Sequence, residues 1–172
     1  MDPSPPNCDY ETYTINVSSA TATAKNDFRV DFQTPLKDVV EFSLIACNIP
    51  IPTTPAAEVV YINIPEIQSS FNDYLEPVTN NTGTSSLLRS SIGSVYKTYS
   101  GTDADARIIF RNEYPIKTRI IHPLERLSSL TIKLFADVAG TATPVTVPDT
   151  VGYYTFQIKC LRKNLCNFNI CN

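Results

Sequence analysis

The fold is decided by the stretch FRVDFQTP, residues 28–35. Within it the apolar residues Phe28, Val30 and Phe32 alternate with charged or polar residues, which is the two-residue period of a half-buried β-strand. Pro35 predicts the end of that strand, because proline has no N–H group to donate to a central ladder. The stretch therefore predicts a strand with one apolar face turned to a core.

Seven further segments carry a β pattern, which makes eight candidate strands. They are residues 13–17, 38–49, 59–64, 93–99, 107–110, 127–135 and 153–161. Between them, residues 66–91 are polar and irregular, with Leu87-Leu88 as a candidate helical turn, and residues 140–148 form a Thr/Pro-rich loop. Several connections are too long for tight hairpins, and this favours a two-sheet sandwich over a meandering barrel.

The composition agrees with this pattern. The chain has 172 residues, of which 42% are hydrophobic and 18% charged, as in a globular protein of one domain. The β-branched and aromatic residues Thr, Ile, Val, Tyr and Phe are abundant, and 13 prolines leave few stretches long enough for a helix. We expect an all-β protein with a single jelly roll, an eight-stranded, two-sheet antiparallel sandwich. An immunoglobulin-like sandwich has the same periodicity, although the absence of Trp argues against it.

The ends of the chain differ from its middle. Residues 1–9 are Pro-rich and polar and predict a flexible N-terminal arm. Residues 10–161 hold all the candidate strands and predict the jelly-roll domain. Residues 162–172 predict a C-terminal tail that contains two cysteines.

The net charge of −3 argues against a protein that coats nucleic acid, since such proteins cluster Lys and Arg. The charge is uneven, however: residues 1–80 hold 11 acidic and 3 basic residues, and residues 81–172 hold 6 and 11. The basic residues Lys159, Arg162 and Lys163 slightly weaken this argument against nucleic-acid binding, and only for the tail. We expect no specific nucleic-acid partner.

The N-terminus has no basic start followed by an apolar run, and no stretch reaches the ~20 apolar residues that cross a bilayer. We expect no transmembrane segment and synthesis in the cytosol, where thiols are reduced.

No residue pattern predicts catalysis. His122 is the only histidine, and no nucleophile motif accompanies it. The pair Asp103 and Asp105 lacks the later ligands of a calcium loop. We therefore predict no catalytic, cofactor-binding or metal site, and no enzyme.

The densest thiol cluster is Cys160, Cys166 and Cys171, whose spacing is too wide for a structural zinc site. Cys160 shares the alternating apolar face of its strand and is predicted to be a core residue. For Cys166 and Cys171 the alternatives are ordinary tail residues, metal binding, or disulfides with neighbouring chains.

One succession of apolar residues and prolines runs through most of the chain. Its residues are Phe28, Val30, Phe32, Pro35, Leu36, Val39, Phe42, Leu44, Ile49, Pro50, Tyr61-Ile62-Asn63-Ile64-Pro65-Glu66-Ile67 and Tyr154-Thr155-Phe156-Gln157-Ile158. Over about residues 10–161, this succession resembles the jelly-roll virion proteins of large nucleocytoplasmic DNA viruses, the minor-capsid and penton-like group.

The resemblance implies a structural component of an icosahedral capsid, made in the host cytoplasm and carried in the virion. Its partners would be the major capsid protein and other minor capsid proteins, or further copies of itself in a homopentamer at the vertices. Residues 1–9, 67–91, 136–150 and 162–172 are the expected contacts. The alternative is a carbohydrate- or receptor-binding β-sandwich, which would stack sugars on Tyr74, Tyr96, Tyr99 and Tyr114.

Overall fold

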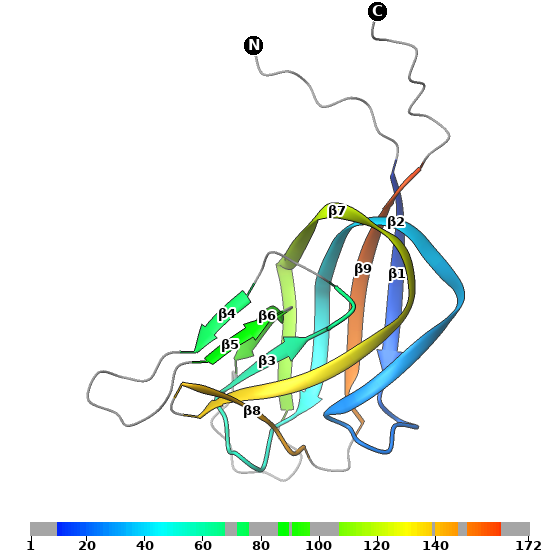
Figure 1. Ribbon diagram of the computed structural model, residues 1–172. Helices are drawn as coiled ribbons and strands as arrows, with labels where there is room; N and C mark the ends of the chain where they lie inside the picture. The colour runs from blue at the N-terminus through cyan, green and yellow to red at the C-terminus, as the bar shows by residue number, and fades with distance from the viewer. Residues whose placement is uncertain are drawn as a thin grey trace, which may run out of the picture.

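Every element in the described part of the chain is a β-strand (Figure 1). The computed structural model describes residues 10–67, 72–75, 86–89, 91–96, 107–138, 140–147 and 151–162. The strands are β1 (Tyr10–Ser18), β2 (Asp27–Pro50), β3 (Val59–Asn63), β4 (Asn72–Leu75), β5 (Ser86–Arg89), β6 (Ser91–Tyr96), β7 (Arg107–Val138), β8 (Thr141–Pro144) and β9 (Tyr153–Leu161). The prediction of an all-β protein is confirmed.

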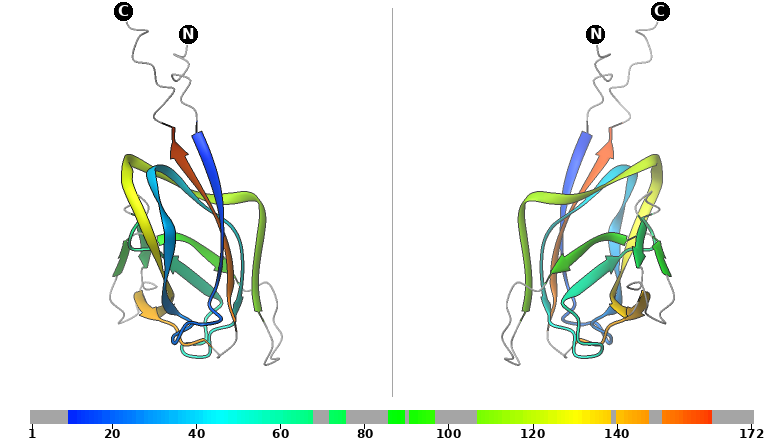
Figure 2. Two further views of the ribbon diagram at one scale, coloured as in Figure 1. Left: turned by 90° about the vertical axis from the view of Figure 1, so that its right-hand side faces the viewer. Right: turned by 90° about the vertical axis from the view of Figure 1, so that its left-hand side faces the viewer.

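The strands form one curled antiparallel sheet in the order β1-β9-β2-β7-β3-β6, with β8 paired to the end of β7. A separate pair, β4-β5, lies beside it. Figure 2 shows how the sheet curls back on itself. An apolar core fills the space inside the curl.

The curl is carried by β2 and β7, which are 24 and 32 residues long and pair with each other over most of their lengths. The register shifts at three places, and at two of them the strands turn. Residues 32–35 of β2 stand opposite one β7 residue, between the pairs Asp31–Ser129 and Leu36–Leu127. Residues 120–123 of β7 stand opposite one β2 residue, between the pairs Val39–Leu124 and Glu41–Arg119. Extra residues on one strand bend it sharply, so both strands turn a corner there.

These corners correct the prediction that Pro35 ends a strand. Pro35 lies among the extra residues at the corner of β2, which have no register partner on β7, so its missing N–H breaks no ladder hydrogen bond. The strand continues to Pro50. In the same way the predicted strands 107–110 and 127–135 are the two ends of the single strand β7. Asp38 completes the β2 corner with a left-handed φ of 52°.

Two predicted loops contain strands. Leu87-Leu88 is not a helical turn, because β5 pairs with β4 there and Leu88 is buried. Residues 141–144, inside the predicted loop 140–148, form β8 against the end of β7. Gly140 permits this reversal with a φ of 85°, and Asp137 Oδ1 accepts its N–H at 2.7 Å.

The core follows the predicted alternation. On β9, Tyr154, Phe156 and Ile158 are buried, and the residues between them are at least partly exposed. Phe42 on β2 packs against Phe156, with ring centroids 5.0 Å apart. Phe28, the first residue of the decisive stretch, meets Tyr154 at 5.9 Å. The decisive stretch therefore does face the core.

A side chain replaces a strand at one point on β7. Here β3 stops pairing at Asn63, opposite Lys133. Beyond that pair, the Glu66 carboxylate accepts the backbone N–H of Thr131 at 2.9 Å and also the Thr131 hydroxyl. The exposed ladder position of β7 is thereby satisfied without a neighbouring strand.

Candidate functional site

A groove opens along one edge of the molecule, between β1 and the first half of β2. Its volume is about 990 Å³. We call it the open-edge groove, and the left view of Figure 2 faces the two strands that border it. It is lined by Glu11, Tyr13 and Ile15 of β1, residues 31–38 of β2, and Cys160, Leu161 and Arg162 at the end of β9.

The β1 side of the groove consists of side chains that point toward the core. Val17, Ile15, Tyr13 and Glu11 share the face of the sheet that carries Tyr154, Phe156, Ile158 and Cys160, because each is the register partner of one of them. Val17 is 4% exposed, Ile15 is half-buried, and Tyr13 is 38% exposed. The core face of β1 is thus increasingly exposed from Val17 through Ile15 to Tyr13.

The β2 side shows the same gradient. Phe28 is buried, whereas Val30 and Phe32 on the same face are only partly buried. The corner of β2 then carries the chain across to β9, where Val39 pairs with Cys160. The two borders of the groove therefore close at Val17 and Phe28 and diverge toward the other end.

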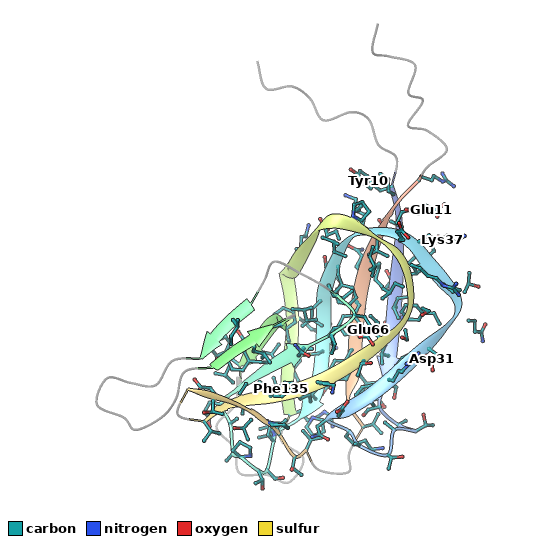
Figure 3. All side chains as sticks on the ribbon, in the orientation of Figure 1. Tyr10, Glu11, Asp31, Lys37, Glu66 and Phe135 are labelled. Atoms are coloured by element: carbon teal, nitrogen blue, oxygen red, sulfur yellow. The ribbon has the colours of Figure 1, made fainter. Side chains whose placement is uncertain are left out.

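Charged groups gather at the open end. Figure 3 shows Glu11 and Lys37 close to each other there, with Asp31 further along β2. Glu11 accepts a hydrogen bond of 2.6 Å from the Tyr13 hydroxyl and forms an ion pair of 2.9 Å with Arg162. The hydrogen bond from Tyr13 and the charge of Arg162 lower the pKa of Glu11, and the same hydrogen bond raises the pKa of Tyr13. Glu11 and Arg162 thereby link the ends of β1 and β9.

The floor of the groove is apolar, and its one thiol is unreactive. Ile15, Phe32, Leu36 and Cys160 supply it. Cys160 is buried, as its alternating face predicts, and burial raises the pKa of its thiol to about 11. Such a thiol stays protonated near neutral pH and acts as a packing group rather than a nucleophile. Cys47 is similar, because burial raises its pKa to about 12.

Most other candidate residues from the sequence fall outside this groove. The backbone of His122 lies at the β7 corner, and its side chain is not among those described. Asp103, Asp105, Cys166 and Cys171 lie outside the described residues. Among the residues that are described, no three His, Cys, Asp or Glu side chains form a group that could hold a metal ion.

The candidate sugar-stacking tyrosines are not brought together as a described platform. Tyr96 on β6 is 63% exposed. Tyr74 and Tyr114 lie on β4 and β7, with side chains that are not described, and Tyr99 lies outside the described residues.

The sequence predicts the strands that border the open-edge groove but not the groove itself. Tyr13, Ile15 and Val17 gave a clear strand signal, but periodicity does not say which strands lie at an edge. Glu11, Lys37 and Arg162 carried no signal beyond their charge.

Neither a scan against protein-family models nor a search of the curated proteins finds a match for this chain. In the described part of the chain, no helix is long and apolar enough to cross a membrane.

Proposed function

We propose that the curled sheet is a jelly roll. Apart from the short β8, which pairs with the end of β7, cutting β2 at Pro35 and β7 at Pro123 divides the sheet into two groups of four segments. One group is β1, β9, the second half of β2 and the first half of β7, in that order. The other is the first half of β2, the second half of β7, β3 and β6. Eight segments in two antiparallel sheets is the count expected of a jelly roll.

On this fold we propose a structural role: the chain is a component of an icosahedral viral capsid, a minor capsid or penton protein that joins or stabilises capsomers. The observation that carries the proposal is the two-by-four strand order, since jelly rolls are typical capsid domains. The resemblance along residues 10–161 supports the same role. A fold alone does not fix a function, so the surface must also suit such contacts.

The outer face of β1, β9, β2 and β7 suits contact with another flat surface. Across its middle, one row of register partners consists of Thr14, Gln157, Ser43 and Lys117, of which Ser43 is buried and the other three are at least partly exposed. In the row that contains Asn48, Tyr153 is 54% exposed and Ile109 is 48% exposed. Polar side chains around a few exposed apolar anchors are typical of protein interfaces.

In this role the protein acts by burying surface, without turnover. Its partners are the major capsid protein and other minor capsid proteins, and its place is the virion after synthesis in the host cytoplasm. A penton position requires in addition a head-to-tail contact that closes as a fivefold ring of identical copies.

The decisive experiment is to purify particles from the system that encodes this chain and to quantify their proteins by mass spectrometry. The proposal requires the chain in a fixed ratio to the major capsid protein. A chain that is expressed during infection yet absent from intact particles would contradict it.

Two further measurements sharpen the role. A stable pentamer of the recombinant protein in light scattering supports the vertex, whereas a monomer supports a peripheral minor position. On a glycan array, a saturable signal that Tyr96→Ala abolishes and Tyr153→Ala preserves would replace the capsid role with sugar binding.

A further inference from the structure

The open-edge groove has the features of a site for one more strand. β1 pairs only with β9, and residues 27–31 of β2 pair only with β7, so within the described residues each strand has one free edge along the groove. The floor between these edges is apolar and partly uncovered. An extended segment could pair with a free edge and place every second side chain on that floor.

The chain contains a sequence of this kind shortly after Arg162. Residues 165–171 read Leu-Cys-Asn-Phe-Asn-Ile-Cys, so that Cys166, Phe168 and Ile170 fall on one face of an extended chain. Asn167 and Asn169 fall on the other face. Seven extended residues span about 20 Å, which exceeds the roughly 14 Å from Glu11 to Ile15 along β1. The length and the apolar period both fit.

The position of Arg162 argues for a groove on another copy. Arg162 lines the groove at its open end and is tied to Glu11, so the tail starts at the mouth. To enter the same groove, it would have to reverse at once through Lys163 and Asn164. A tight two-residue reversal needs a positive φ at its central residues. Glycine adopts a positive φ readily and asparagine tolerates it, but lysine does not. Both edges of β9 are already filled by β1 and β2, so a hairpin with β9 is also closed to it.

We propose that residues 165–171 of a second copy of this chain add as a strand to the free edge of β1, with Cys166, Phe168 and Ile170 facing into the open-edge groove. The link from Arg162 to Leu165 through Lys163 and Asn164 extends about 10 Å, so the groove of the second copy lies beside the mouth of the first. The exchange does not require a capsid, so it and the capsid role can fail separately.

Disulfide trapping in the full chain tests the proposal. Tyr13→Cys places a thiol on the groove side of β1, and Thr12→Cys places one on the opposite face of the same strand. Both are made with Cys8→Ser, Cys160→Ala and Cys171→Ser, which removes the groove thiol beside Tyr13 and leaves Cys166 as the tail thiol, and are oxidised with diamide. Tyr13→Cys should give covalently linked chains at least tenfold faster than Thr12→Cys, and Cys166→Ser should abolish them.

Equal rates for the two variants would overturn the proposal, as would a disulfide formed within single chains on denaturing gels. Sedimentation of the full chain gives an independent measurement. Phe168→Asn with Ile170→Asn should weaken self-association at least tenfold, while Asn167→Ser with Asn169→Ser should preserve it. Self-association unchanged by the apolar pair, or absent from the unmodified chain at any soluble concentration, would also overturn it.

Discussion

At one end of the β1–β2 edge the two strands close over the core, and at the other end they leave it open. At the closed end, Val17 and Phe28 are buried, and Phe28 packs on Tyr154. At the open end, Tyr13 and Phe32 occupy the equivalent inward positions of the same two strands and remain partly exposed. The pairing of β1 with β9 continues unbroken through both ends.

The difference shows that strand pairing and core coverage are separate properties of this sheet. The backbone ladder of β1 is complete on its β9 side everywhere, but a core face also needs a second layer opposite it. The β2 corner at residues 32–35 carries that layer away from β1. Within the described part of the chain, the inward-facing side chains of Tyr13 and Phe32 at the open end therefore have no second layer over them. A partner that binds there would bury more apolar surface than at the closed end.

The largest test of this comparison replaces a phenylalanine in the fully covered core and one in the groove. Phe42→Ala should lower the free energy of unfolding by about 3–5 kcal/mol, because Phe42 is fully buried against Phe156. Phe32→Ala should cost about 1 kcal/mol, since the ring is already partly hydrated. Urea unfolding followed by far-ultraviolet circular dichroism measures both.

Dilute protein is essential in that comparison. A loss for Phe32→Ala as large as that for Phe42→Ala would mean that the open end is covered in solution. Repeating the titration at several concentrations then distinguishes cover by a second copy from cover within one chain, because only the former depends on concentration.

Alternation predicted the strands well, because it depends on neighbours in the sequence. The decisive stretch, the β9 pattern and the burial of Cys160 were all read from a period of two. The corners were missed for a physical reason. A proline ends a ladder, and the sequence does not reveal whether the chain then leaves the sheet or bends and pairs again, as β2 does after Pro35 and β7 after Pro123.

The open-edge groove was also beyond the sequence. It depends on which strands lack an outer neighbour, and this follows from pairings between residues as distant as Tyr10 and Leu161. The same holds for Glu66. Glu66 lies in the apolar run that ends at Ile67. Nothing in that run predicts that its carboxylate accepts the N–H of Thr131, 65 residues further along the chain.

The second test concerns the edge that a side chain closes. Glu66→Ala removes the acceptor for the Thr131 N–H and hydroxyl, and should lower the free energy of unfolding by about 2 kcal/mol. Glu66→Gln keeps one acceptor oxygen and should lose less than half as much. Hydrogen exchange at Thr131 should speed up in Glu66→Ala, which locates the effect. An unchanged exchange rate would show that this edge of β7 is protected by another group.

The smallest expected effect lies at the open end, in the pair of Glu11 and Tyr13. The pKa of Glu11 is lowered in the folded protein, so its contribution to stability is complete above its ordinary pKa of 4.5 and is lost as the pH falls through the folded value. The stability difference between the unmodified chain and Glu11→Gln should therefore be greater near pH 6 than below about pH 3. Because Glu11 lies at the surface, this difference should be smaller than that for Glu66→Ala.

Tyr13→Phe separates the two causes of the shift. It removes the hydrogen bond, which is the larger cause, and leaves the charge of Arg162, so the Glu11 carboxyl should titrate closer to 4.5 but still below it in carbon-detected NMR. High salt should then remove most of the remaining shift, since an exposed ion pair is screened. If a second copy covers the open end, raising the protein concentration should make the Glu11 titration less sensitive to salt. A Glu11 titration that responds equally to salt at every concentration would instead mean that this end of the groove stays open to water.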